Sequence, residues 1–211
     1  MIRVEIWSDV VCPFCYIGKR HLEAALKQFE GRDRVRVVWK SFELNRNADR
    51  GGRTSVYEML SKKYGMSLEQ AKQSSEQVAE RAAAVGLRFD FDRVVPANSF
   101  DAHRLVHLAA KHGLEDRAHE RLFAAHFTEG RRIDDLETLR RIGVELGLDP
   151  EEVKTVLEGD AYALDVRQDE KEAYSLGVRG IPFFLFNRTK AISGAQPVEL
   201  FTEALRTASD D

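Results

Sequence analysis

Strand patterns occupy both ends of the chain, and helical patterns fill its middle. Apolar and polar residues alternate over residues 2–7, and residues 35–42 are rich in β-branched and aromatic side chains, so each segment predicts a strand. Between them, apolar residues recur at spacings of three and four as far as Phe29, which predicts a helix with a stop at Gly31. A strand, a helix and a strand in succession form a βαβ unit, in which the two strands run parallel.

Helical periodicity continues from about Thr54 to Gly177, with recognisable boundaries. One helix is marked by a capping box over residues 67–70 and a stop at Gly86, and another by a cap at Asn98 or Ser99 and a stop at Gly113. A third helix begins with a cap at Asp149 and a first-turn proline at Pro150. The last helix of this region is expected from about Ala161 to Leu176. This long run of helices predicts a helical insertion between two parts of a sheet.

The strand pattern returns in the last part of the chain. Residues 183–186 form a continuous apolar run that suits a strand buried on both faces, and residues 189–193 follow as a second strand. A helix is then expected from Pro197 to about Arg206, with residues 208–211 fraying. The fold class is therefore α/β, with residues 1–50 and 160–211 forming one discontinuous domain and residues 51–159 an inserted helical subdomain.

Charge and targeting signals narrow the range of partners. The 32 basic and 35 acidic residues are interspersed and give a formal charge of −3, so no concentrated basic surface is expected for nucleic acid or an anionic membrane. No apolar run approaches the ~20 residues of a membrane span. The first residues lack a basic region and a cleavage site, so we expect a cytoplasmic protein.

The two cysteines of the chain, Cys12 and Cys15, stand where the first strand gives way to the first helix. Unpaired N–H groups and the positive end of the helix dipole stabilise a thiolate at that position. Pro13 suits the first helical position, where its missing N–H costs little. We therefore expect Cys12 to be the nucleophile and Cys15 the resolving thiol. Phe14 offers no charge or hydrogen bond to a thiolate, which predicts a moderate reduction potential.

Two other interpretations of the cysteine pair have to be compared with the redox one. Zinc sites use the same spacing, and His103 and His107, four apart on a predicted helix, would be the remaining ligands. An inert structural disulfide is disfavoured in a reducing compartment. The position between strand and helix favours the redox interpretation.

A proline directly ahead of a strand, Pro182, is the second unusual element. It removes a donor from the ladder, and a cis bond between Ile181 and Pro182 would leave the neighbouring backbone free to pair with an extended substrate. Taken alone, a trans proline is the common case. The partnership of Pro182 with the cysteine pair makes the cis bond the expected form.

These elements together resemble the thioredoxin superfamily, and the helical insertion resembles its DsbA-like branch. Residues 8–18, 39–45 and 98–104 are similar to segments of the FrnE-like members of that branch. The resemblance implies a thioredoxin-like fold with an inserted α-helical subdomain and a dithiol–disulfide exchange enzyme acting on protein or small-molecule thiols and disulfides. It implies Cys12 and Cys15 as the redox pair, Pro182 as the cis-proline after Ile181, and no cofactor beyond the redox-active disulfide, with glutathione as one candidate substrate.

The chain also departs from these relatives. Phe14 stands where periplasmic relatives carry histidine, and no second cysteine pair follows near the C-terminus, so strong oxidase activity and a relay are not expected. In a reducing cytoplasm the resting pair is mostly dithiol, which favours reductase or isomerase work. The architecture also resembles 2-hydroxychromene-2-carboxylate isomerases and kappa-class glutathione transferases, which have serine at the position of Cys12. A glutathione-dependent isomerase or transferase is thus the alternative.

Five residues are candidates for substrate contact. Phe14 and Tyr16 flank the cysteines and are expected to line a substrate groove, together with Ile181. Asn98 and His103 lie in one of the resembling segments, and His103 would face the same groove. The simpler interpretation, a helix cap for Asn98 and a packed or surface histidine for His103, is favoured.

Overall fold

The computed structural model describes residues 1–210. In chain order its elements are β1 (Ile2–Ser8), α1 (Pro13–Gln28), the 3-10 turn η1 (Arg32–Arg34), β2 (Val35–Ser41), α2 (Val56–Tyr64), α3 (Leu68–Ala84), α4 (Phe100–Lys111), α5 (Glu115–Phe127), α6 (Leu136–Glu145), α7 (Pro150–Glu158), α8 (Ala163–Ser175), β3 (Phe183–Phe186), β4 (Lys190–Ser193) and α9 (Val198–Asp210).

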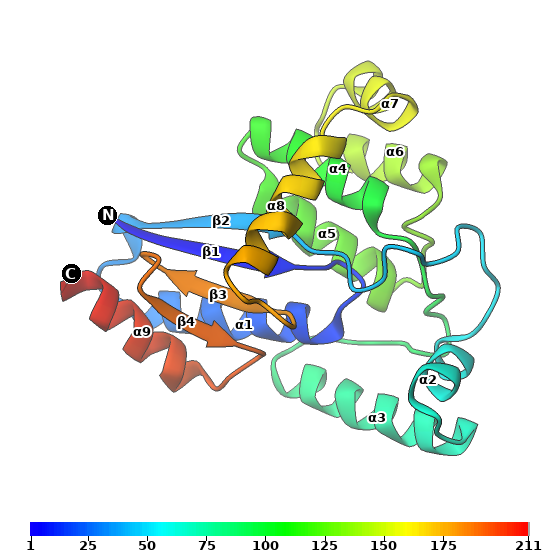
Figure 1. Cartoon of the computed structure of the whole chain (residues 1–211), viewed down its shortest axis with the longest axis horizontal. Coiled ribbons are helices and arrows are strands. Elements are labelled where there is room, and N and C mark those ends of the chain that lie inside the picture. Colours follow the sequence, from blue (N-terminus) through cyan, green and yellow to red (C-terminus); the bar gives the residue numbers. More distant parts are fainter. Residues whose placement is uncertain (211) are drawn as a thin grey trace.

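Four strands of the described residues form one sheet in the order β2-β1-β3-β4 (Figure 1). The β1 and β2 strands run parallel, with Ile2 opposite Val35, as the βαβ pattern predicts. The β3 strand pairs with β1 in antiparallel sense and places Phe183 beside Trp7. The last part of the chain is thereby brought next to the end of β1, where the cysteines follow.

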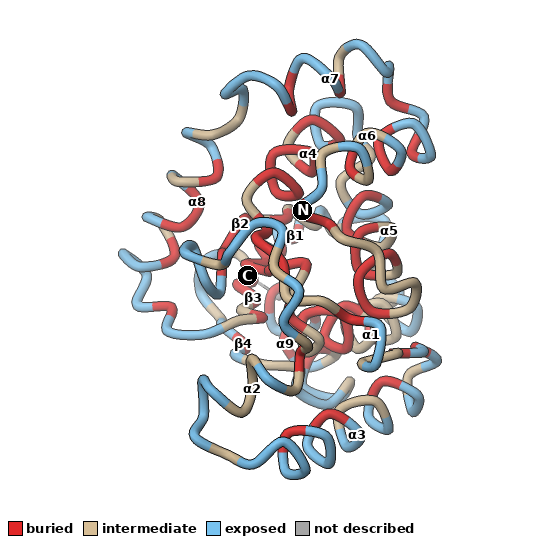
Figure 2. Tube along the Cα trace, turned by 90° about the vertical axis from the view of Figure 1, so that its right-hand side faces the viewer, coloured by how far each residue is buried: buried red, intermediate tan, exposed pale blue. Residues whose placement is uncertain are grey.

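Helices cover both faces of this sheet, and the alternation of side chains along the strands decides which face each residue meets. One face packs on α1 and α9, and its buried residues include Ile2, Val4, Ile6, Leu22, Phe184, Phe186, Phe201 and Leu205. The other face packs on α8 through Trp7, Leu185 and Ala173. The trace in Figure 2 shows the resulting buried strands at the centre with exposed outer helix turns.

The helices between β2 and α8 fall into two groups. The α4, α5, α6 and α7 helices share a core of their own, to which Val10 of the β1–α1 turn contributes. The α2 and α3 helices form a hairpin at the opposite side (Figure 1), and each begins with a complete capping box. The box at Ser67 was predicted, and the matching one at Ser55 with Glu58 was not.

The predicted end of the last helix is wrong. The α9 helix continues through Asp210 instead of fraying from Ala208. The Ala208 side chain is buried against the sheet, and its carbonyl oxygen accepts a hydrogen bond from Asn187 Nδ2 at 2.9 Å. These contacts fix the last turn. Asp211, also expected to fray, lies outside the described residues.

Candidate active site

Cys12 and Cys15 occupy the first turn of α1. Cys12 is the residue that precedes the helix, Pro13 is its first residue, and the Cys15 N–H donates to the Cys12 carbonyl oxygen at 3.1 Å. The Cys12 N–H in turn donates to the carbonyl oxygen of Asp9 at 3.0 Å. Both thiols are free and buried, with exposed fractions of 3% and 1%. The structure therefore presents a dithiol at a helix N-terminus.

The surroundings of Cys15 keep its thiol protonated in this state. Burial raises the pKa of Cys15 well above its usual value, and the neighbouring Cys12 raises it further. The Ser8 hydroxyl and the Asp9 backbone act in the opposite direction. Such a thiol is a poor first nucleophile, and this matches the expected role of Cys15 as the resolving thiol.

The segment that carries Pro182 lies directly opposite Cys12. The peptide bond between Ile181 and Pro182 is cis, and the Cys12 Sγ lies 4.0 Å from the Ile181 carbonyl oxygen. The Pro182 carbonyl oxygen accepts the Gly194 N–H at 2.7 Å, which ties the segment to the end of β4. The structure thus brings together the two cysteines, Ile181 and Pro182, from opposite ends of the chain.

Gly18 makes this close approach of α1 and the proline segment sterically feasible. A Cβ atom at Gly18 would lie 3.0 Å from the Phe184 ring and 3.1 Å from Pro182 Cγ. Both distances are shorter than ordinary carbon–carbon contact. No role was predicted for Gly18 from the sequence, although an isolated glycine inside a helical pattern is a recognised signal of close packing.

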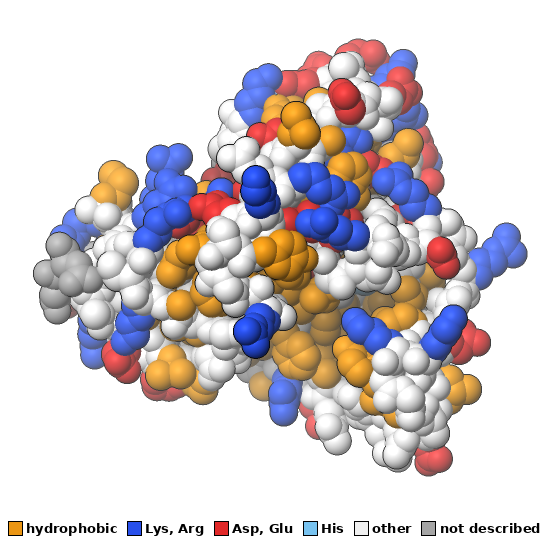
Figure 3. Space-filling view, in the orientation of Figure 1, with side chains coloured by type: hydrophobic (Ala, Val, Ile, Leu, Met, Phe, Trp, Pro, Cys, Tyr) orange, Lys and Arg blue, Asp and Glu red, His pale blue; other side chains and the backbone are white. Residues whose placement is uncertain are grey.

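The cysteines lie in an apolar cluster that includes the α2–α3 hairpin. Phe14 and Ile181 pack against this cluster and are only partly buried. The same holds for three residues of α2, namely Tyr57, Met59 and Leu60. Figure 3 shows hydrophobic side chains gathered in a hollow between the hairpin and the rest of the molecule, with Lys and Arg side chains around it. Phe14 and Ile181 thus belong to the partly exposed apolar surroundings of the cysteines.

Tyr16, in contrast, belongs to the core and not to a groove. Its side chain is buried, with the ring stacked on Phe123 at 4.7 Å between centroids and on Phe89 at 5.9 Å. Its hydroxyl donates to Glu120 Oε1 at 2.6 Å. Tyr16 therefore joins α1 to α5, and the expectation that it lines a substrate groove is corrected.

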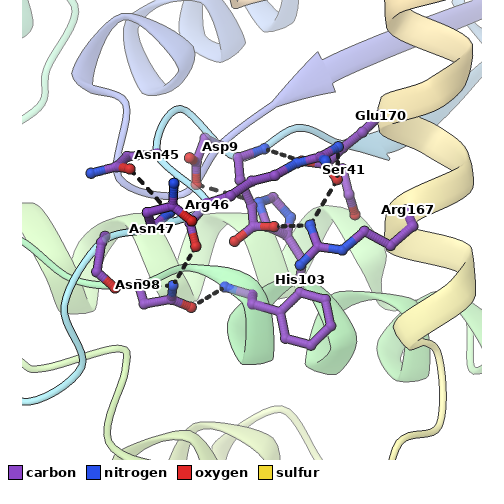
Figure 4. Close-up of polar contacts among 12 residues, drawn as sticks. Asp9, Ser41, Asn45, Arg46, Asn47, Asn98, His103, Arg167 and Glu170 are labelled. Atoms are coloured by element: carbon purple, nitrogen blue, oxygen red, sulfur yellow. Dashed lines mark hydrogen bonds and ion pairs between the residues drawn. The ribbon is translucent and has the colours of Figure 1, made fainter.

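Asn98 organises a loop and the start of α4 (Figure 4). Its Oδ1 accepts the Phe100 N–H at 3.1 Å, and its Nδ2 donates to the Ala48 carbonyl oxygen at 3.2 Å. Ser99, the residue before the helix, makes no capping hydrogen bond with its side chain. These contacts correspond to the simpler interpretation, in which Asn98 caps the helix.

His103 is fully buried and does not face the hollow. Its Nε2 lies 3.3 Å from Asp9 Oδ1, and Asp9 is itself fully buried (Figure 4). Burial alone would lower the pKa of His103, but Asp9, Glu43 and Glu170 outweigh it and raise that pKa above 6.5. The histidine is thus packed, as the simpler interpretation has it, but it is packed against the turn that precedes Cys12.

A group of buried charges around His103 was not foreseen from the sequence. Glu43 and Glu170 are fully buried, and both contact the Arg167 guanidinium. Glu170 also pairs with Arg46 at 2.6 Å. Residues 43 to 46 lie in and beside one of the segments that resemble FrnE-like proteins, and this resemblance was the only available signal.

The histidines proposed as zinc ligands have other partners. His103 pairs with Asp9, and His107 Nε2 lies 3.1 Å from Ser41 Oγ and 3.3 Å from Asp169 Oδ2. Within residues 1–210, no group of three His, Cys, Asp or Glu side chains is arranged to hold a metal ion. The geometry around the cysteines is that of a dithiol site.

Comparison with known proteins identifies the family. The model of the DSBA-like thioredoxin domain matches residues 3–206. The chain belongs to the DSBA-like thioredoxin domain family. This membership and the structural matches confirm the predicted thioredoxin-like fold with its DsbA-like helical content.

Relatives of this DSBA-like chain are found among both sequences and structures. The uncharacterized protein YwbO of Bacillus subtilis (strain 168) is 32% identical over 206 residues, covering 97% of this chain and 96% of that protein. The probable DsbA oxidoreductase SCO1869 from Streptomyces coelicolor has a TM-score of 0.93 at 42% identity, covering 100% of this chain and 91% of that one. The cytosolic disulfide reductase DsbM from Pseudomonas aeruginosa shares the fold, with a TM-score of 0.68 at 21% identity and coverage of 99% and 98%.

In the part of the chain that the structure describes, no helix combines the length and the apolar character that a membrane span requires.

Proposed function

We propose that this protein is a thiol–disulfide oxidoreductase that works as a reductase or isomerase on protein or small-molecule disulfides in the cytoplasm. The observation that carries the proposal is the position of the Cys12 sulfur. It lies at the N-terminus of α1, 4.0 Å from the Ile181 carbonyl oxygen. The protonated Cys15 thiol belongs to the first turn of the same helix. This arrangement supplies a nucleophile, a resolving thiol and an adjacent backbone edge.

The reaction begins when the Cys12 thiolate attacks one sulfur of a substrate disulfide. A bond forms between Cys12 and that sulfur, the substrate S–S bond breaks, and the departing thiolate takes up a proton. The Cys15 thiol then loses its proton and attacks Cys12, which releases the second substrate thiol. Two electrons have passed from the dithiol to the substrate, and a thiol reductant restores the pair.

The burial of both sulfurs supports a preference for particular substrates. Only 3% of Cys12 is exposed, and its neighbours Phe14 and Ile181 are apolar. A disulfide buried within a rigid folded protein would not reach the Cys12 sulfur in this arrangement. We propose that extended peptide segments and small disulfides are the preferred substrates.

Two arguments bear on the direction of the reaction. Phe14 gives a Cys12 thiolate no charge and no hydrogen bond, so the reduced form gains little of the stabilisation that makes a dithiol strongly oxidising. The fold is compatible with disulfide reduction, since DsbM, described as a cytosolic disulfide reductase, shares it. Both points favour reductase or isomerase work over oxidation.

The proposal is tested by trapping and by turnover. The Cys15→Ser variant is expected to accumulate mixed disulfides on Cys12 when it is mixed with an oxidised peptide, because the resolving step is lost. The Cys12→Ser variant, which keeps Cys15, is the matched control and is expected to trap none and to lose insulin reduction. Absence of any mixed disulfide on Cys12 would refute the proposal.

The same variants distinguish the glutathione-dependent isomerase or transferase. That chemistry uses glutathione as the thiol and has no resolving step, so turnover with glutathione would survive Cys15→Ser. Full activity of the Cys15→Ser variant, with no disulfide reduction by the unaltered protein, would favour this alternative.

A further inference from the structure

The turn between β1 and α1 is organised around Asp9. Its backbone carbonyl oxygen accepts the Cys12 N–H at 3.0 Å, and its carboxylate accepts the Leu44 N–H at 2.7 Å and the Val11 N–H at 3.4 Å. The same carboxylate is the partner of His103, 3.3 Å away. One fully buried residue thus contacts the backbone of Cys12 through its own backbone and helix α4 through its carboxylate; Figure 4 shows Asp9 beside His103.

The charges around this pair balance when His103 is protonated. Three buried carboxylates face the group: Asp9 from the β1–α1 turn, Glu43 from the segment that follows β2 and Glu170 from α8. Two guanidiniums, Arg46 and Arg167, pair with Glu43 and Glu170 at its outer side. An imidazolium at His103 supplies the third positive charge. A buried carboxylate without such a partner is costly, so the ion pair is the stable form.

Two titratable neighbours, His119 and His126, come from α5 and stay uncharged near neutral pH. Burial lowers the pKa of His119 to about 3 and that of His126 to about 4. The charge of His103 acts on His119, and that of Asp9 acts on His126. His103 is therefore the histidine of this group whose pKa is raised, so it keeps its charge to higher pH than a free imidazole.

We propose that His103, as an imidazolium paired with Asp9, is a positioning residue that holds the Cys12 turn in its reactive geometry, and that loss of its proton lowers the reactivity of Cys12. The inference rests on the proposed function, because it takes Cys12 as the reacting sulfur. His103 touches neither a substrate nor the sulfur and acts through Asp9.

The test measures Cys12 directly. In a Cys15→Ser background Cys12 is the one remaining thiol, and its rate constant for alkylation by iodoacetamide is followed from about pH 6 to about pH 10. The chain with His103 is expected to react on the order of tenfold faster than the His103→Gln chain near pH 6, the equivalent of about 1.4 kcal/mol. The ratio is expected to fall towards one at high pH, where His103 is also uncharged.

A purely structural role for His103 would give a ratio that does not change with pH. His107→Gln is the matched control, since His107 lies one turn further along α4 and pairs with Asp169 at the same 3.3 Å, away from the turn. Its ratio is expected to stay close to one. Asp9→Asn keeps an acceptor for the Leu44 N–H and removes the charge, so it is expected to reproduce the His103→Gln profile and to add little in the double variant.

Each outcome decides the inference. A pH-independent ratio, an equal effect of His107→Gln, or losses that multiply in the double variant would overturn it. If neither His103→Gln nor Asp9→Asn folds, the His103 ring is titrated by NMR in the unaltered chain, where a pKa at or below 6.5 would overturn it. Alkylation needs no disulfide substrate, so a pH-dependent ratio without reductase activity would refute the proposed function alone.

Discussion

The imidazole of His119 stacks on the indole of Trp39, with 4.1 Å between ring centroids. This contact places an ionisable side chain of α5 against β2, where both residues are buried. His126, two turns further along α5, is buried as well. Two basic groups are thus held uncharged inside the folded chain.

Stability is expected to fall in mild acid because of these two histidines. In the unfolded chain both titrate near pH 6.5, whereas the folded pKa values are about 3 for His119 and about 4 for His126. Below pH 6.5 the unfolded state therefore binds protons that the folded state does not, so stability is present above that pH and is lost as pH falls. Each histidine contributes up to about 1.4 kcal/mol per pH unit.

Urea denaturation at about pH 7.5 and about pH 5 measures this loss, and His119→Phe is the informative variant. Phenylalanine keeps a ring against Trp39 but does not titrate, so its loss between the two pH values is expected to be smaller. His103, whose pKa is raised, keeps its contribution below pH 6.5 and loses it at higher pH. An equal loss in both proteins would contradict the prediction.

Tyr16 is expected to matter for stability and not for substrate contact. Tyr16→Phe removes the hydrogen bond to Glu120 and keeps the stack on Phe123, so the free energy of unfolding is expected to fall by about 1 kcal/mol with reductase activity retained. Tyr16→Ala also opens a cavity and is expected to cost about 3–5 kcal/mol. Loss of activity in a stable Tyr16→Phe protein would show that the hydroxyl serves the substrate after all.

Gly18→Ala is expected to disturb the site from the side of the helix. The added methyl group meets the Phe184 ring and Pro182 Cγ, so either α1 or the proline segment has to shift, at a cost of about 1–3 kcal/mol. A slower reaction of Cys12 with disulfides is expected to accompany this loss. Gly180→Ala is the matched control, because a Cβ at Gly180 has no neighbour within 4 Å.

Asn187 is expected to be sensitive for two separable reasons. It has a positive φ of 45°, its Oδ1 accepts the Arg3 N–H at 2.9 Å, and its Nδ2 donates to Ala208. Asn187→Ala loses both bonds and strains the backbone, for an expected cost of about 2–3 kcal/mol. Asn187→Gly relieves the strain and is expected to recover about 1 kcal/mol. Thermal or urea unfolding of the two variants measures both parts.

The elements that position the cysteines could be predicted because their signals are local. The alternation in residues 2–7, the β-branched run at 35–42 and the apolar run at 183–186 each report a strand on their own. The parallel pairing of β1 and β2 then follows from the helix between them. The partnership of Cys12 with Pro182 was predicted from a cysteine pair and a proline at strand boundaries, and the family resemblance implied it as well.

The buried charges could not be predicted because their partners are distant in sequence. Glu43 and Arg167 are 124 positions apart, and each alone has the composition of a surface residue. Tyr16 was misplaced for a different reason. It shares the three- and four-residue spacing of the apolar face of α1, and its nearness to Cys15 was given more weight than that spacing. Ala208 is too small to give a clear burial signal.

The pairing of β1 with β3 also has a consequence for biosynthesis. Cys12 leaves the ribosome early, but its neighbour Ile181 stands 169 positions later, so roughly ten to thirty seconds of translation separate them. During that interval the nascent polypeptide carries two thiols without the Ile181–Pro182 segment that lies opposite Cys12 in the finished fold. The proposed alignment of a substrate beside Cys12 is therefore expected only when synthesis is almost finished.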